Sequence, residues 1–194
     1  MSNWIGIDWG GTYIKAGLVD DKGKIVLKKV FSSQTLQKPK SFIAHLKDLI
    51  ASFCVHGKVC GVGIGAPGVI DFEQGSICYL PNVPGWKGYP LCRVLEKELE
   101  VAVALDNDAN VFAFAQGKVG VARLSSQAIF LTLGTGLGSA VMIQGKILHG
   151  RLSAGELAHV PLVMDGRKCS CGGRGCVEAY VGIRYIVERY EKLR

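Results

Sequence analysis

Asp8-Trp9-Gly10-Gly11-Thr12 separates two short apolar runs, residues 4–8 and 14–19, near the start of the chain. These runs and a third over residues 24–30 predict strands joined by turns that contain glycine. In the first turn, Gly10 and Gly11 let backbone N–H groups approach a phosphate because no Cβ stands in the way. Thr12 adds a hydroxyl donor, and Asp8 could hold Mg²⁺ directly or through water. The alternative is a tight hairpin turn, in which Asp and Gly are also favoured.

A turn of the same kind returns in the second half of the chain. Residues 128–133 predict a strand, Gly134-Thr135-Gly136-Leu137-Gly138 a glycine-rich turn, and residues 139–143 another strand. Gly145-Lys146-Ile147-Leu148 then repeats the pattern of Gly23-Lys24-Ile25-Val26. This shared order predicts two related domains that face each other across a cleft, with a phosphate-binding turn in each.

The residues between the two turns alternate between predicted helices and strands. Pro39 opens a helix with apolar residues on one face, and another helix is predicted over residues 91–99. Strands are predicted over residues 59–64 and 101–105, and the stretch from 71 to 89 is expected to be a long, partly ordered loop. The order βββαβαβα predicts an α/β domain over residues 1–118, followed by the start of a second over 119–194. The apolar face of the first helix is expected to comprise Phe42, Ile43, Leu46, Leu49, Ile50 and Phe53.

Composition excludes several classes of protein. The chain has 194 residues, of which 48% are hydrophobic and 20% charged, as in an ordinary globular protein. Its formal charge is +7, but Lys and Arg are interleaved with acids, so no nucleic-acid partner is expected. No apolar run reaches the roughly 18–20 residues that span a membrane. The first residues lack the basic and apolar regions of a signal peptide, which predicts a cytoplasmic protein.

His159, Cys169, Cys171 and Cys176 form the most specific motif of the chain. One His and three Cys are the ligand set of a Cys₃His zinc site, and the glycines between them permit a tight loop around one ion. The alternatives are a disulfide with a spare thiol, or unrelated free cysteines; a cytosolic context favours zinc. The other four cysteines, Cys54, Cys60, Cys78 and Cys92, are expected to be small core residues.

Carboxylates flank both this motif and a predicted strand end. Glu156 and Glu178 lie beside the expected metal ligands and could bind adjacent hydroxyls of a sugar ring, although helix-surface positions are the alternative. Asp106-Asn107-Asp108 follows a predicted strand with a buried pattern. It either caps a short helix that runs to Gln116 or presents a carboxylate and an amide to a cleft. A carboxylate placed there can accept a proton from a substrate hydroxyl during phosphoryl transfer.

Residues 63–68 match the pattern G-x-G-x-x-G after a strand, but the residues that follow are extended and turn-like. A dinucleotide site requires a helix to begin at the third glycine, so this interpretation is rejected. A glycine-rich strand end beside a substrate is the preferred alternative.

Taken in order, these motifs resemble those of the ROK family of repressors, open reading frames and sugar kinases, within the actin/hexokinase-like superfamily. The resemblance covers nearly the whole chain and implies an actin/hexokinase-like (ribonuclease H-like) α/β fold with duplicated βββαβα domains. Family members are usually longer, so the second domain is expected to be incomplete here. The motifs that carry the resemblance are Asp8 to Thr12, Gly65 to Asp71, Pro81 to Trp86, Asn107 to Asn110, Gly134 to Gly138, Gly155 to His159 and Cys169 to Glu178.

The resemblance implies an ATP-dependent hexose kinase that phosphorylates its sugar, with glucose expected, at the 6-hydroxyl. Asp108 would be the general base, and His159, Cys169, Cys171 and Cys176 would hold a structural zinc. The residues implied to bind the sugar are Gly65, Asn82, Asn107, Glu156, His159 and Glu178. Those implied to bind ATP phosphates and Mg²⁺ are Asp8, Gly10, Gly11, Thr12, Gly134, Thr135 and Gly136.

Other functions compatible with these residues stay open. Within the enzyme class, N-acetylmannosamine, N-acetylglucosamine, fructose or allose could replace glucose, and polyphosphate could replace ATP. The rival from another class is a sugar-binding regulator or fragment without catalytic activity. Repressor members carry an N-terminal helix-turn-helix, whereas this sequence begins at its first strand, which disfavours a repressor. The family often forms homodimers.

Overall fold

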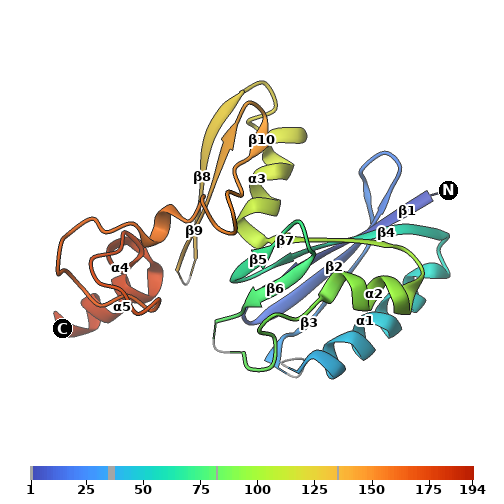
Figure 1. Cartoon of the computed structure of the whole chain (residues 1–194), viewed down its shortest axis with the longest axis horizontal. Coiled ribbons are helices and arrows are strands. Elements are labelled where there is room, and N and C mark those ends of the chain that lie inside the picture. The colour runs from blue at the N-terminus through green and yellow to red at the C-terminus, as the bar shows by residue number, and fades with distance from the viewer. Residues whose placement is uncertain (1, 35–37, 82, 135) are drawn as a thin grey trace. The chain divides into compact units, whose positions relative to one another are not determined.

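The computed structural model of the chain describes residues 2–34, 38–81, 83–134 and 136–194 (Figure 1). The chain divides into two compact units, the first ending at Asp108 and the second running over Ala109–Arg194. The domain boundary expected between residues 118 and 119 stays a prediction. Within the described residues, no helix is long and apolar enough to cross a membrane.

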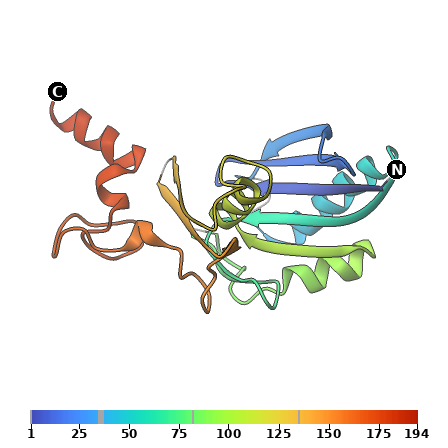
Figure 2. The same ribbon diagram turned by 90° about the horizontal axis from the view of Figure 1, so that it is seen from above.

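A five-stranded sheet forms the centre of the first unit (Figure 2). Its order is β3-β2-β1-β4-β7, with antiparallel pairing within β1, β2 and β3 and parallel pairing of β4 with both β1 and β7. Every second side chain of β1 is buried, which is the period of a strand with one face on the core. The strands are β1 (Ser2–Trp9), β2 (Tyr13–Asp20), β3 (Ile25–Ser32), β4 (Lys58–Ala66) and β7 (Ala102–Asn107).

Among its described residues, this unit also contains the helices α1 (Pro39–Cys54) and α2 (Leu91–Leu99). Pro39 lies in the first turn of α1, where a missing N–H costs no helical hydrogen bond. The six residues predicted for its apolar face are its buried residues. Cys54 follows that face by one position and is exposed, so its expected place in the core is wrong, whereas Cys92 on α2 is buried.

The segment after β4 is more ordered than the sequence predicts. Instead of a continuous loop, β5 (Val69–Asp71) pairs antiparallel with β6 (Ser76–Tyr79). The Asp71 side chain accepts a hydrogen bond from Gln74 N–H at 3.0 Å, and Gly75 adopts a positive φ of 59°, which together close the hairpin. Because β5 follows the G-x-G-x-x-G stretch directly, the chain stays extended there, as predicted.

Trp86 anchors the end of this segment to the core. Its side chain is fully buried, and its ring meets Trp9 edge to face at 4.8 Å between ring centroids and Phe42 at 5.3 Å. Trp9 is the last residue of β1 and Phe42 lies on α1. The aromatic cluster therefore ties the strand that carries Asp8 to the segment that carries Trp86.

The second unit contains a three-stranded antiparallel sheet of order β10-β9-β8, the counterpart of β3-β2-β1. The duplication predicted from the sequence is therefore present in these strands. Ala113 of α3 packs with Phe130, Ala140 and Met142 on one face of the sheet. The elements of this part of the chain are α3 (Asp108–Lys118), β8 (Gln127–Leu133), β9 (Leu137–Ile143), β10 (Lys146–Ile147), the 3₁₀ helix η2 (Leu157–His159), α4 (Glu178–Val181) and α5 (Ile183–Lys192).

Candidate functional site

In the first unit, the predicted phosphate-binding and sugar-binding residues meet at one edge of the sheet. Asp8 of β1 is paired in register with Gly65 of β4, and Gly65 with Asp106 of β7. Asn107 is the last residue of β7, and Asp108 opens α3 immediately after it. In open α/β sheets, ligands bind at the carboxyl ends of the parallel strands. The parallel part of this sheet therefore brings the predicted binding and catalytic groups to the edge where ligands bind.

The turn between β1 and β2 is closed by its own backbone. Gly10 N–H donates to Tyr13 O at 3.0 Å, and a Cβ on Gly10 would lie only 2.9 Å from that oxygen. The Ser33 hydroxyl donates to Gly11 O at 2.6 Å, and Ser33 N–H to Thr12 O at 3.0 Å. These contacts fix the glycine turn against the end of β3.

Asp8 is paired with a cation that sequence reasoning missed. Its Oδ2 atom accepts a hydrogen bond from Lys15 Nζ at 2.8 Å, and both side chains are about half exposed, at 54% and 53%. Lys15 stands directly across the strand pair from Asp8, so the hairpin register explains the contact. An exposed ion pair of this kind contributes about 0–1 kcal/mol, so a metal ion can compete for the Asp8 carboxylate.

Asn107 is joined to the glycine-rich loop after β4. Its Nδ2 atom donates to Gly68 O at 3.1 Å. Gly68 has a φ of +90°, and a Cβ there would collide with Tyr79 O of the neighbouring hairpin, so only glycine suits this position. Two of the predicted sugar-binding segments are thus held together. Asn82, the third predicted in this unit, lies outside the described residues.

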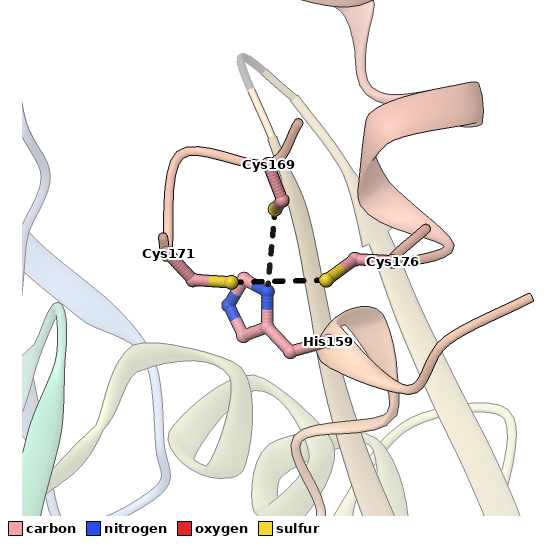
Figure 3. A group of neighbouring side chains, drawn as sticks. All are labelled: His159, Cys169, Cys171 and Cys176. Atoms are coloured by element: carbon pink, nitrogen blue, oxygen red, sulfur yellow. Dashed lines mark hydrogen bonds between the residues drawn. The ribbon is translucent and has the colours of Figure 1, made fainter. Parts of the chain in front are cut away.

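The second unit brings the four predicted metal ligands together (Figure 3). Their side chains point toward one another, and one ligand atom from each lies within 4.8 Å of all the others. Cys171 Sγ and Cys176 Sγ are 3.7 Å apart, and Cys169 Sγ is 3.8 Å from His159 Nδ1. Two sulfurs bound tetrahedrally at about 2.3 Å from one zinc ion lie about 3.8 Å apart, so the spacing and donor set fit this metal.

Glycines allow the loop to turn around the cluster. Gly172 and Gly175 have φ values of +91° and +74°, a conformation that favours glycine. Cys169 N–H donates to Gly173 O at 2.9 Å, and Gly172 N–H to Cys169 O at 3.1 Å. Gly172 and Gly175, two of the glycines between the predicted ligands, are therefore favoured by the backbone of the loop.

The thiols of the cluster differ in acidity. Burial, helped by hydrogen bonds to Cys171 and Cys169, raises the pKa of the Cys176 thiol to about 12. Burial also acts to raise the pKa of Cys171, but hydrogen bonds from Gly173 N–H and the neighbouring thiols outweigh it and lower that pKa. A bound cation must therefore displace the proton of Cys176 in particular.

Glu178 is a buried carboxylate with hydrogen bonds on both oxygens. Oε2 accepts from Leu137 N–H at 3.0 Å, and Oε1 accepts from the Ser170 hydroxyl at 2.9 Å and from Cys169 Sγ at 3.5 Å. Burial acts to raise the pKa of Glu178, but these bonds and the charge of His159 outweigh it and lower that pKa. Glu178 is 8% exposed, so the alternative of a helix-surface charge is wrong.

A buried serine positions the segment that carries Glu156 and His159. Ser139 of β9 is 2% exposed; its hydroxyl donates to Gly155 O at 2.9 Å and accepts from Ala158 N–H at 3.2 Å. Sequence reasoning missed both Ser139 and Ser170. The signal for Ser139 was a single polar residue within an otherwise small and apolar strand, and Ser170 was the residue between two predicted ligands.

The predicted phosphate turn of this unit lies between β8 and β9. Gly134 N–H donates to Gly136 O at 3.0 Å, which closes the turn. A Cβ on Gly136 would collide with Glu178 Oε2, so any other residue there would require the Glu178 carboxylate to move. Thr135 lies outside the described residues.

Comparison with known proteins agrees with this architecture. Residues 4–193 match the ROK family. The glucokinase of Thermotoga maritima is 39% identical over 194 aligned positions, and the alignment covers 97% of this chain and 61% of that protein. The crystal structure of a ROK family glucokinase from Streptomyces griseus in complex with glucose and AMPPNP superposes with a TM-score of 0.84 at 32% identity, covering 98% of this chain and 60% of that one. The xylose repressor of Caldicellulosiruptor bescii is 30% identical over 195 aligned positions, and the alignment covers 97% of this chain and 49% of the repressor.

The duplicated strands, the mixed sheet and these structural similarities define an α/β protein of the actin/hexokinase-like class. Within that class, the chain belongs to the ROK family. It spans about 60% of the length of the glucokinases that it matches.

Proposed function

We propose that this chain forms the sugar-binding and catalytic part of an ATP-dependent hexose kinase, with glucose as the substrate. The observation that carries the proposal is the similarity, over 98% of the chain, to a glucokinase structure in complex with glucose and AMPPNP. The arrangement of Asp8, Gly65 and Asn107 at one sheet edge supports it, because that edge is where such sheets bind ligands.

In this proposal Asp108 is the general base. It accepts the proton of the sugar 6-hydroxyl while that oxygen attacks the γ-phosphorus in line, and ADP leaves. Its place at the start of α3, directly after β7, supports the role because it puts Asp108 at the end of the sheet where such folds bind ligands. Asp8 and the Gly10-Gly11-Thr12 turn would hold phosphates and Mg²⁺, and the ion would supply positive charge against the charge that develops on the transferred group.

The groups proposed to bind sugar hydroxyls are Asn107, the backbone around Gly65, Glu156, His159 and Glu178. Glu178 retains acceptor capacity for this, because two carboxylate oxygens offer about four lone-pair sites and three are occupied. We also propose that the bound metal is zinc, and that the protein acts in the cytoplasm, where thiols stay reduced.

The test is a coupled assay of ADP release with a panel of hexoses, in which glucose should give the highest kcat/KM. Asp108→Asn should lower kcat by about two to four orders of magnitude, the typical contribution of a general base, while glucose affinity stays within a few fold. Glu100→Gln, an exposed carboxylate just beyond α2, serves as the matched control and should retain full turnover. Near-normal turnover of Asp108→Asn would overturn the assignment of the base.

A second candidate function is a sugar-binding regulator, and the similarity to the xylose repressor favours it. A regulator would bind a sugar but release no ADP with any hexose in the panel. Isothermal titration of the same sugars therefore separates the two functions, because a kinase must show both binding and turnover.

A further inference from the structure

One carboxylate connects the metal cluster to the glycine turn between β8 and β9. Glu178 directs Oε2 to Leu137 N–H, at 3.0 Å, at the end of the turn. It directs Oε1 to the Ser170 hydroxyl, at 2.9 Å, between the two ligands Cys169 and Cys171. The two loops are 41 and 8 residues away from Glu178 along the chain, so the contacts are tertiary.

The turn is held to the same helical segment at a second point. Ile183 N–H, at the start of α5, donates to Gly134 O at 3.2 Å. Between these two bonds, a Cβ on Gly136 would collide with the Glu178 carboxylate, and one on Gly182 would lie 3.4 Å from Gly136 Cα. The turn therefore packs closely on residues 178–183.

Ser170 is fixed on the side of the metal cluster. Its neighbours in sequence are both metal ligands, and its own N–H donates to the Tyr185 hydroxyl at 2.7 Å. A bound ion sets the positions of Cys169 and Cys171, and thereby the position of the Ser170 hydroxyl that orients Glu178.

We propose that Glu178 is a positioning residue that transmits the order of the metal-bound loop to the glycine turn, so that the metal supports ATP binding as well as sugar binding. The statement about ATP rests on the function proposed above for this turn. The path of hydrogen bonds from Ser170 through Glu178 to Leu137 N–H does not rest on that function. It predicts that the position of Leu137 N–H depends on the metal, whatever the turn binds.

The experiment uses the full chain and measures two quantities in the absence of sugar. The first is the exchange rate of the Leu137 amide by NMR, with metal bound and after chelation. The second is the Kd for ATP with Mg²⁺. Variants are Glu178→Ala, the conservative Glu178→Gln, and Glu188→Gln as a matched control on α5, where Glu188 forms an exposed pair with Arg184.

In Glu178→Ala the Leu137 amide should exchange about ten-fold faster or more, as expected for the loss of one hydrogen bond to a charged acceptor. Chelation of the wild-type chain should give a change in the same direction. Glu178→Gln should restore most of the protection because its side-chain carbonyl can accept from Leu137 N–H. Glu188→Gln should match the wild type, and the Kd for ATP should rise in parallel with the exchange rate.

Equal exchange of Leu137 in Glu178→Ala and wild type would overturn the proposed path. An exchange rate that does not respond to chelation would overturn the role of the metal in it. Should Glu178→Ala fail to fold, Ser170→Ala tests the same path, because Ser170 is exposed and its loss removes the shorter of the two hydrogen bonds to Glu178 Oε1. If Leu137 behaves as expected but the wild type binds no ATP, the proposed role of the turn is wrong while the path stands.

Discussion

Replacing Ser139 by alanine tests how β9 positions the segment that carries Glu156 and His159. The hydroxyl makes two hydrogen bonds inside the second unit, to Gly155 O at 2.9 Å and from Ala158 N–H at 3.2 Å. Ser139 is 2% exposed and Ala158 is fully buried, so water cannot readily replace the lost group. Ser139→Ala should therefore destabilise this segment while leaving the packed volume almost unchanged.

The magnitude follows from the fate of each partner. Gly155 O keeps its hydrogen bond from Leu157 N–H at 2.8 Å. Losing the bond from the Ser139 hydroxyl therefore costs the net value of one hydrogen bond, about 1 kcal/mol. Ala158 N–H loses a buried acceptor, which costs about 1–3 kcal/mol. The free energy of unfolding of the second unit should fall by about 2–4 kcal/mol. Because His159 lies next to Ala158, metal affinity should fall by about 10–100-fold, as for other groups that orient a ligand.

The assay can separate the two units because all three tryptophans, Trp4, Trp9 and Trp86, lie in the first. Tryptophan fluorescence during urea unfolding therefore reports on the first unit. Metal release to a coloured chelator reports on the second. In Ser139→Ala the midpoint for metal release should shift to lower urea by about 1–2 M, while the tryptophan midpoint stays unchanged.

Ser125→Ala is the matched control, since Ser125 is exposed outside the cluster. Metal affinity and release in Ser139→Ala equal to those of Ser125→Ala would refute the reasoning. A shift of the tryptophan midpoint without a change in metal release would refute it as well, because the loss would then lie in the wrong unit.

Substitutions at Trp86, Cys171 and Lys47 test three other features of the structure. Trp86→Ala empties a fully buried site between Trp9 and Phe42 and should lower the stability of the first unit by about 3–5 kcal/mol, measured by urea unfolding; an unchanged midpoint would contradict it. Cys171→Ser should reduce metal content from about one ion per chain to near zero by elemental analysis, and a wild type purified without metal would exclude the site. The hydrogen bond and charge of Lys47 lower the pKa of Glu98, so this pair stabilises the fold above the unfolded-state pKa of Glu98 and less as pH falls through the folded-state value. Lys47→Met should return the pKa of Glu98 toward its ordinary value in an NMR titration, whereas Lys97→Met should move it less.

The sequence predicts most elements of the fold because their patterns are local. The buried face of α1 follows from helical spacing alone, and the repeated strand–turn–strand units follow from the glycine turns. The β5–β6 hairpin was missed because Gly, Pro and Asn indicate turns equally well inside a loop and inside a hairpin. What closes it is the side chain of Asp71 together with the positive φ of Gly75, and the composition of the stretch specifies neither.

The candidate site likewise contains features that the sequence predicts and features that it does not. The cluster of His159, Cys169, Cys171 and Cys176 could be predicted because residue type and spacing define its donor set before folding. The bridging role of Glu178 could not, because it depends on Leu137, which is 41 residues away and contributes only its backbone N–H. The pairing of Lys15 with Asp8 could be predicted from the sequence, because the hairpin register that places them opposite each other follows from the turn between β1 and β2.

β9 carries both ends of the proposed connection between the cysteine loop and the glycine turn. Leu137 and Ser139 lie two residues apart and are both buried, so they lie on the same face of the strand. Leu137 N–H is bonded to Glu178, beside the cysteine loop, and the Ser139 hydroxyl holds the segment that ends in His159. A metal ion bound by His159 and the cysteines would join these two segments and close a ring that begins and ends on β9. Ser139, the metal and Glu178 would each contribute a link of that ring, so opening it at any of the three should loosen the same turn.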